Sequence, residues 1–177
     1  AVHRLVEGIQ LRRSGILAPI LLMGYTLPAE AGLVAQWGLT PTVSNHDQVH
    51  ALAVAAARLG AVLPVHVKVD SGMGRAGLLP EDAVAFCTWL ADFRCLRLEG
   101  LYTHFAVADE AAAASHAFTQ QQFDVFQAVS TALAASGVSI PLCHAANSAA
   151  AIAFPVARLN AIRMGIVMYG MLPSHEC

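Results

Sequence analysis

The sequence is poor in charged residues. Only 12% of its 177 residues are charged, and a single lysine stands beside nine arginines. The net charge of -2 leaves no basic surface for nucleic acid. In contrast, 56% of the residues are hydrophobic, which excludes a disordered chain and supplies enough apolar material for one large core.

Long apolar runs are also missing. The longest lies around residues 16–25, and a membrane-spanning helix needs about twice that length, ~20 residues. Residues 1–15 carry charges throughout, which is unlike the apolar segment of a secretory signal. We therefore expect neither a membrane span nor a signal peptide.

Cysteines are few and show no spacing typical of a bound metal. Cys87, Cys95, Cys143 and Cys177 form neither a CxxC pair nor a zinc-ligand pattern. In a chain this hydrophobic, the cysteines indicate small buried side chains in a reducing compartment. We expect a cytoplasmic protein without a metal site.

Short apolar runs alternate with longer helical patterns. We expect six strands, at residues 19–24, 40–44, 65–70, 98–105, 140–144 and 159–163. A helix precedes them over residues 2–14, and helices follow at residues 28–37, 45–59, 80–90, 112–136 and 147–154. Alternation of nearly continuous apolar strands with helices predicts an α/β fold with a parallel sheet covered by helices.

Two absences select the type of parallel sheet. No glycine-rich dinucleotide fingerprint follows the first predicted strand, which argues against a Rossmann-type sheet. A complete TIM (β/α)8 barrel needs about 250 residues. The sequence therefore predicts one domain, residues 1–177, that forms an incomplete barrel lacking about two βα units.

Polar residues follow the carboxyl ends of several predicted strands. Arg75, His104, His144 and Arg163 all stand at such positions. In a barrel these positions converge on one face, where active sites are built. A lone histidine there is more often a satisfied core residue, but the repetition predicts a functional site.

The segment from Asn147 to Ser148 has two interpretations. The two residues either cap a helix in the ordinary way or help form a cup of backbone N–H groups for an anion. Gly165, just after the last predicted strand, lets a ligand approach the backbone closely. The loops after the last two barrel strands are the usual phosphate site, so this pattern favours a phosphorylated ligand.

Four segments resemble alanine racemases in order and spacing. They are Lys68-Val-Asp-Ser-Gly-Met-Gly-Arg75, Gly100-Leu-Tyr-Thr-His-Phe-Ala-Val-Ala-Asp109, His144-Ala-Ala-Asn-Ser148, and Arg163-Met-Gly-Ile-Val-Met-Tyr-Gly170 with Pro173-Ser174. The likeness covers essentially the whole chain. It implies a pyridoxal 5'-phosphate enzyme with an N-terminal barrel and a C-terminal β-domain, which acts as a head-to-tail homodimer. Such an isomerase interconverts L-alanine and D-alanine by two-base racemisation and supplies D-alanine for cell-wall peptidoglycan.

The resemblance also implies a role for each motif residue. Arg75, His104 and Arg163 would form the catalytic set, with Arg163 bonded to the pyridine nitrogen of the cofactor. His104 and His144 would support Arg163 from behind, and Arg75 would lie near the phenolic oxygen of the cofactor and the substrate carboxylate. Lys68 would lie behind Arg75, and this lysine is carbamylated in some members of the family. The alternative for Lys68 is a strand lysine that pairs with a carboxylate.

The same resemblance implies a phosphate site. Asn147, Ser148, Gly165 and Ile166 match the residues that hold the cofactor phosphate, and together with His104, His144 and Arg163 they make up the implied cofactor-binding set.

The two residues that move protons in this family have no match here. One is the lysine that forms the Schiff base on the first barrel strand, and Lys68 lies in a different motif. The other is a tyrosine from the β-domain of the partner subunit, and Tyr25, Tyr102 and Tyr169 do not match it. We expect a barrel fragment that lacks the first βα unit, most of the second strand and the β-domain. Such a fragment would be inactive alone and would bind the cofactor weakly.

Three other interpretations stay open at this point. The parent protein would be a racemase of the same fold that acts on serine or on basic amino acids. It would otherwise be a non-enzymatic barrel that carries pyridoxal phosphate. The last alternative is an unrelated barrel that binds a sugar phosphate in the same cup.

Overall fold

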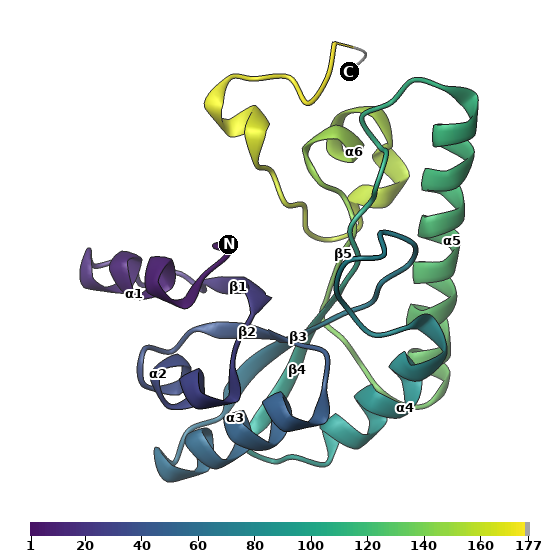
Figure 1. The fold of residues 1–177 in the computed structure, drawn as a ribbon. Helices are drawn as coiled ribbons and strands as arrows, with labels where there is room; N and C mark the ends of the chain where they lie inside the picture. Colours follow the sequence, from purple (N-terminus) through teal and green to yellow (C-terminus); the bar gives the residue numbers. More distant parts are fainter. Residues whose placement is uncertain (176–177) are drawn as a thin grey trace.

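The computed structural model describes residues 1–175 and contains one parallel sheet of five strands. The strands are β1 (Leu21–Tyr25), β2 (Thr40–Val43), β3 (Leu63–Lys68), β4 (Leu96–Tyr102) and β5 (Leu142–His144). Their order in space is the same as their order in the chain, β1-β2-β3-β4-β5. A doubly wound sheet reverses its order at a switch point, and this sheet does not. The curved sheet in Figure 1 is therefore the partial α/β barrel that the sequence predicts.

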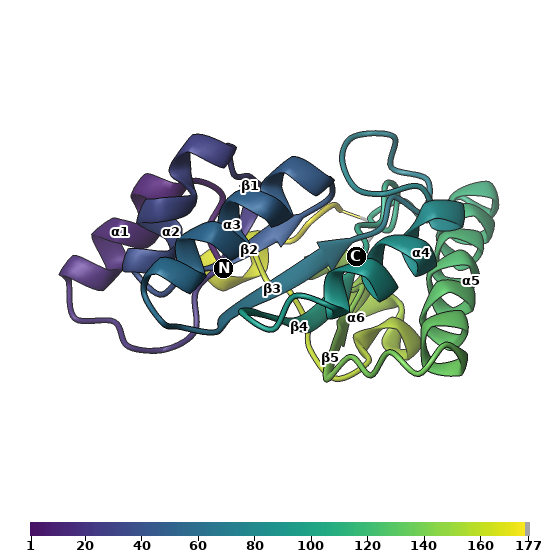
Figure 2. The ribbon, with the colours of Figure 1, turned by 90° about the horizontal axis from the view of Figure 1, so that it is seen from below.

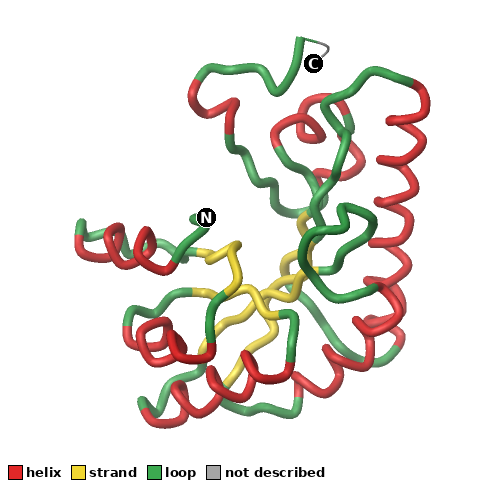
Figure 3. Tube along the Cα trace, in the orientation of Figure 1, coloured by secondary structure: helices red, strands yellow, loops and turns green. Residues whose placement is uncertain are grey.

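Helices cover the outer side of the curved sheet (Figures 2 and 3). In chain order they are α1 (Leu5–Arg13), α2 (Ala31–Gln36), α3 (His46–Arg58), α4 (Pro80–Ala91) and α5 (Ala113–Ala135). The short helix α6 (Ser148–Ala153) follows β5, and three 3-10 helices occupy Pro28–Glu30, Pro155–Arg158 and Ile166–Tyr169. Outer helices leave the carboxyl ends of the strands open on one face, where a site can form.

Local side-chain chemistry explains where the helices begin. The side chain of Asn45 accepts a hydrogen bond from the backbone N–H of Gln48 at 2.9 Å and caps α3. Pro80 occupies the first turn of α4, with Glu81 and Asp82 beside it at the positive end of the helix. Because each of these signals involves residues only a few positions apart, the helix starts can be predicted from the sequence.

The core lies between the strands and the outer helices. Val43, Val65 and Val67 are completely buried in β2 and β3, and Val49 and Leu52 of α3 are equally inaccessible. Burial of each such aliphatic side chain stabilises the fold by about 1.5–3 kcal/mol. The continuous apolar character of the strands thus follows from their burial on both faces.

The sixth predicted strand is wrong. Residues 159–163 form no strand, and Leu159 turns the chain with a φ of 49°. Asn160 instead bonds the edge of β5 with its side chain, which accepts from the Cys143 N–H at 2.8 Å and donates to the Pro141 carbonyl at 2.7 Å. The amide side chain occupies the backbone groups that a sixth strand would need.

The predicted first helix begins too early. Val2 lies outside α1 and forms a parallel bridge with Leu22. The Val2 N–H donates to the Leu21 carbonyl, and the Met23 N–H donates to the Val2 carbonyl, both at 2.8 Å. Val2 is apolar and lies next to a helical pattern in the sequence, but its backbone pairs with β1.

The structure bears on two expectations from composition, those on membrane-spanning helices and on the cysteines. Within residues 1–175, no helix is both long enough and apolar enough to cross a membrane. Cys87 is buried, Cys95 and Cys143 are half-buried, and none of these three forms a disulfide. Cys177 lies outside the described residues.

Candidate functional site

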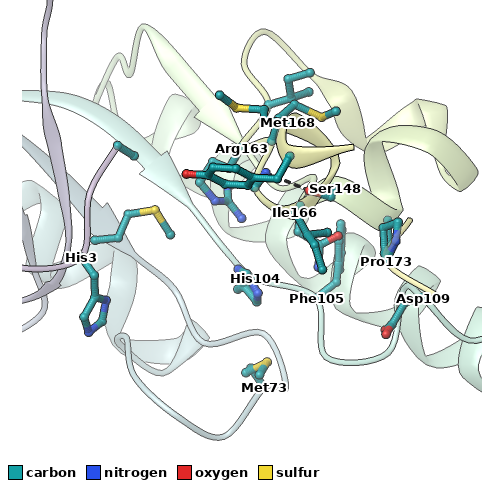
Figure 4. Close-up of a pocket in the computed structure, with 18 of the residues that line it drawn as sticks. His3, Met73, His104, Phe105, Asp109, Ser148, Arg163, Ile166, Met168 and Pro173 are labelled. Carbon is teal, nitrogen blue, oxygen red and sulfur yellow. Dashed lines mark hydrogen bonds between the residues drawn. The ribbon is translucent and has the colours of Figure 1, made fainter. Parts of the chain in front are cut away.

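A cavity of about 840 Å³ opens where the strands end (Figure 4). Its walls come from the residues that follow β4 and β5, from Met23 of β1 and from the chain after residue 161. Six of the predicted site residues line it: His104, Asn147, Ser148, Arg163, Gly165 and Ile166. Residues from separate predicted strand ends therefore meet in one place.

The guanidinium of Arg163 is anchored from several directions. Its Nη1 donates to the His144 carbonyl at 2.9 Å and contacts His144 Nδ1 at 2.9 Å. Its Nη2 donates to the Thr103 carbonyl at 2.5 Å and to the Ala145 carbonyl at 2.9 Å. The backbone N–H of Arg163 also donates to the Ala146 carbonyl at 3.0 Å. These bonds hold the guanidinium plane in one orientation across the ends of β4 and β5.

One donor of Arg163 remains free. Among residues 1–175, its Nε–H is buried and has no hydrogen-bond partner. Burial lowers the pKa of Arg163 to about 10, so the side chain still carries its charge at neutral pH. A buried donor without a partner costs about 1–3 kcal/mol, or more when it is charged. Arg163, which lines the cavity, thus carries a buried cationic N–H group that lacks an acceptor.

His144 lies behind Arg163 and its protonation is determined by its neighbours. Burial and the nearby charge of Arg163 lower the pKa of His144 to about 2, so the ring is neutral. An arginine has only donors, so Nδ1 of His144 must accept from it and the proton of His144 must sit on Nε2. Nε2 lies 2.9 Å from Nδ1 of His66.

Tyr102 packs against both groups from β4. Its ring stacks on His144 with centroids 4.7 Å apart and an interplanar angle of 8°. The guanidinium carbon of Arg163 lies 5.0 Å from the centre of the same ring, within cation–π range. The Tyr102 hydroxyl reaches Thr42 at 3.0 Å, which ties this stack to β2.

His104 lines the cavity, but its ring does not support Arg163 directly. Within residues 1–175, Arg163 takes its acceptors from His144, Thr103 and Ala145, and no hydrogen bond joins it to the His104 ring. Burial, together with the charge of Arg163, lowers the pKa of His104 to about 4. His104 is therefore a neutral imidazole beside the cavity (Figure 4).

Lys68 and Arg75 approach the site from β3 and its following loop. Lys68 is buried at the end of β3, where desolvation and the charge of Arg75 lower its pKa. In the described part of the chain no carboxylate lies within ion-pair distance of Lys68, although the charge of Asp70 opposes the lowering of its pKa. Arg75 is exposed, and its backbone N–H donates to Asp70 at 2.9 Å.

The loop between Lys68 and Arg75 folds around one carboxylate. Asp70 accepts hydrogen bonds from the backbone N–H groups of Gly72 at 3.1 Å, Gly74 at 3.0 Å and Arg75 at 2.9 Å. These bonds hold the pKa of Asp70 below its usual value despite partial burial. The glycine-rich motif is thus an organised loop that carries Arg75 and the cavity residue Met73.

The predicted phosphate cup forms the part of the cavity wall around the start of α6. Asn147 caps α6 by accepting from the Ala150 N–H at 3.0 Å. Ser148 Oγ accepts from the Gly165 N–H at 2.8 Å, the dashed line in Figure 4. This bond joins the start of α6 to the segment after Arg163. Ile166 follows on the same wall, with 42% of its surface exposed.

Some residues at or behind the cavity are not among the site residues predicted from the sequence. His3 and Met23 line the cavity without belonging to a recognised motif. His66 and Glu99 lie behind His144 and share a contact at 3.8 Å. A glycine within a strand often marks a place where another group approaches the backbone closely. Gly100, which pairs with His66, is such a signal in the sequence.

The charges of the site suit an anionic ligand. In addition to burial, the charges of Lys68, Arg75 and Arg163 all lower the pKa of His104, so their fields overlap. None of the three forms an ion pair with a carboxylate within residues 1–175. In the same residues, no group of three or more His, Cys, Asp or Glu side chains is arranged to hold a metal ion. The cavity can bind negative groups through cations and N–H donors.

The chain is similar in sequence to known proteins. Residues 1–173 match the family described as alanine racemase, N-terminal domain. The alanine racemase of Desulfovibrio desulfuricans is 44% identical over 97% of this chain, which spans 45% of that protein.

Solved structures agree with this match. The alanine racemase of Clostridium difficile 630 in complex with cycloserine has a TM-score of 0.93 and 38% identity; the comparison covers 98% of this chain and 47% of that one. A histidine racemase from Leuconostoc mesenteroides has a TM-score of 0.83 and 30% identity, with coverages of 95% and 44%. The chain thus spans just under half the length of the proteins that it matches.

Proposed function

Because this chain belongs to the alanine racemase family, we propose that it forms the pyridoxal-phosphate-binding barrel of an enzyme that interconverts L-alanine and D-alanine. The observation that carries the proposal is the unpartnered Nε–H of Arg163 at the wall of the cavity. The pyridine nitrogen of pyridoxal 5'-phosphate is an acceptor that satisfies such a donor. The residues present therefore fit this cofactor.

Arg163 suits a restrained form of cofactor chemistry. When bound, pyridoxal phosphate supplies an electron sink that makes the α-hydrogen of an amino acid acidic. The guanidinium keeps its proton at neutral pH, so it donates a hydrogen bond without protonating the pyridine nitrogen. A weaker sink favours simple proton exchange over side reactions, which is what a racemase requires.

The part of the cavity wall next to Arg163 would hold the phosphate group. We assign this role to Asn147, Ser148, Gly165 and Ile166, because they surround the start of α6 and line the same cavity. The positive end of the helix and the backbone N–H groups there favour an anion. The bond from Gly165 to Ser148 supports the assignment, since it holds the two segments next to each other.

Arg75 and Lys68 would serve the substrate carboxylate. Arg75 carries a charge that reaches His104 and Lys68, and it has no ion-pair partner within residues 1–175. The lowered pKa of Lys68 favours its neutral amine, the form that reacts with carbon dioxide to give a carbamate. A carbamylated Lys68 would offer Arg75 a negative partner and hold its guanidinium in place. His104, a neutral imidazole beside the cavity, would complete the catalytic set with Arg75 and Arg163.

The proton-transferring groups would come from outside these 177 residues. The single lysine, Lys68, lies behind Tyr102 and outside the cavity lining, so it does not hold the cofactor covalently in this proposal. We propose that a further lysine and a tyrosine of a partner subunit supply the two bases, in a cytoplasmic homodimer that provides D-alanine for peptidoglycan. The isolated chain is then inactive.

A second substrate class is favoured by one comparison. A structure with a TM-score of 0.83 is a histidine racemase, so a similar barrel serves an amino acid with a larger side chain. The alternative to alanine is therefore a serine, basic or histidine substrate on the same site.

The test measures loss of optical activity with the protein of the complete reading frame. It is purified, loaded with pyridoxal phosphate and offered alanine, serine, lysine, arginine and histidine. We expect racemisation of alanine to exceed that of the others and the 177-residue chain to be inactive. Preference for another amino acid would replace the substrate, and cofactor binding without any racemisation would favour a non-enzymatic carrier.

A further inference from the structure

The buried cation of Arg163 is connected to a distant carboxylate. Within residues 1–175, no acid pairs with its guanidinium. Instead, Arg163 contacts His144 at 2.9 Å, His144 contacts His66 at 2.9 Å, and Nε2 of His66 faces Oε2 of Glu99 at 3.8 Å. Four side chains, from β3, β4, β5 and the segment that follows Pro155–Arg158, thus form one chain across the sheet, with two hydrogen bonds and a longer final contact.

The direction of this chain follows from its first member. Arg163 can only donate, so His144 accepts at Nδ1 and carries its proton on Nε2. His66 must then accept at Nδ1 and carry its own proton on Nε2, which points to Glu99. Every proton in the series is directed from the cation toward the carboxylate.

Both histidines are neutral at physiological pH. Burial lowers the pKa of His66 to about 4, and burial with the charge of Arg163 lowers that of His144 to about 2. The charges of the chain are therefore at its two ends, Arg163 and Glu99. Arg97 donates to Glu99 at 2.7 Å and holds the carboxylate from the outer side.

A glycine makes room for the His66 ring within this chain of four side chains. His66 pairs with Gly100 in the register of β3 and β4. A Cβ atom at residue 100 would overlap the His66 ring at Nδ1, the atom that accepts from His144. The position of the His66 ring thus depends on the absence of a side chain at Gly100 of the neighbouring strand.

We propose that His66 and Glu99 are positioning residues for Arg163: Glu99 fixes the His66 ring, His66 holds His144 as an acceptor, and His144 keeps the guanidinium in its orientation for the cofactor. The proposal rests on the proposed function for the identity of the cofactor. His66 and Glu99 touch neither cofactor nor substrate, because neither lines the cavity.

The first test uses NMR of the complete protein without cofactor, labelled with ¹⁵N at histidine and arginine. In the unsubstituted protein we expect His144 as a single tautomer with its proton on Nε2, and slow solvent exchange of the Arg163 Nε–H. His66→Leu removes the acceptor and should mix the His144 tautomers and speed that exchange. His66→Asn places an amide oxygen near the position of Nδ1 and should restore both signals.

The second test measures the dissociation constant of pyridoxal phosphate by absorbance. His66→Leu should weaken binding about tenfold, the equivalent of one hydrogen bond to a charged group, ~1.4 kcal/mol. Glu99→Gln keeps an acceptor for His66 but loses the charge, so it should weaken binding only about threefold. Gly100→Ala displaces the ring and should match His66→Leu. Glu81→Gln, on the exposed start of α4, is the matched control without effect.

The outcomes separate the two proposals. Unchanged His144 signals and unchanged cofactor affinity in both His66→Leu and Glu99→Gln would overturn the positioning role. A complete protein that binds no cofactor at all would overturn the proposed function, while the NMR signals would still decide whether His66 orients His144 and Arg163. If His66→Leu fails to fold, the pair His66→Asn and Glu99→Gln decides the question.

Discussion

The cavity has one wall that is firmly bonded and one that is loosely packed. Up to Arg163, side chains bond to backbone across the sheet: Asn160 binds the edge of β5, and the guanidinium binds carbonyl groups of Thr103 and Ala145. After Gly165, large apolar side chains are open to solvent, with Met168 at 72% and Tyr169 at 80% exposure. The difference associates the oriented side chains of the site with hydrogen bonds to the backbone rather than with the amount of apolar surface.

Removal of the Arg163 guanidinium should have the largest effect on this contrast. Arg163→Ala removes the guanidinium donors from the carbonyl groups of Thr103, His144 and Ala145. We expect the free energy of unfolding to fall by about 3–5 kcal/mol, measured by urea denaturation of the complete protein. Arg94→Ala, at an exposed position, is the control. A loss below about 1 kcal/mol would mean that the bonded wall does not depend on this side chain.

Low pH should have the second-largest effect, by lowering the free energy of unfolding through the buried histidines behind Arg163. The native pKa values of His66 and His144, about 4 and about 2, lie below the unfolded value of ~6.5, so the unfolded chain binds more protons in this range. Stability is then full above pH ~6.5 and falls as the pH drops toward 4, by up to about 1.4 kcal/mol per pH unit for each histidine.

Urea denaturation at several pH values measures this slope. His66→Asn removes one of the three histidines whose pKa is lowered, the others being His104 and His144, and should flatten the slope between pH 6 and about 4.5. An equal slope in both proteins would show that other groups cause the acid sensitivity.

Loss of the Asn160 side chain should have a smaller effect. Asn160→Ala removes the two hydrogen bonds to the edge of β5, and we expect a loss of about 1–2 kcal/mol in the free energy of unfolding. Asn160→Asp keeps the acceptor for Cys143 but not the donor to Pro141, so its loss should be intermediate. Equal stability of all three proteins would show that water replaces both bonds.

Substitution in the loose wall should change stability least. Tyr169→Ser removes an exposed ring whose contacts with the described residues are few, so we expect a change within about 0.5 kcal/mol. The measurement is again urea denaturation, here of the 177-residue chain beside the complete protein. A loss above about 1.5 kcal/mol in the complete protein alone would show that other parts of it pack on this wall.

Much of the fold was predictable because its signals are local. The strands β1 to β5 and the helices α2 to α5 follow from apolar runs and capping residues such as Asn45 and Pro80. The strand predicted at residues 159–163 failed because an apolar sequence does not reveal that Asn160 already occupies the edge of β5. Val2 failed for a similar reason, since only the fold brings it beside β1.

By itself, the sequence determined the elements, the parallel sheet and the polar residues at the strand ends, because each depends on neighbours a few positions away. Only the tertiary structure decided which donor of Arg163 stays free and which way the histidine chain is directed. Those properties depend on contacts between residues far apart in sequence, with His66 and His144 separated by 78 positions and Thr103 and Arg163 by 60. A hydrogen bond needs a partner in space and a direction in angle, and both exist only once the strands are placed side by side.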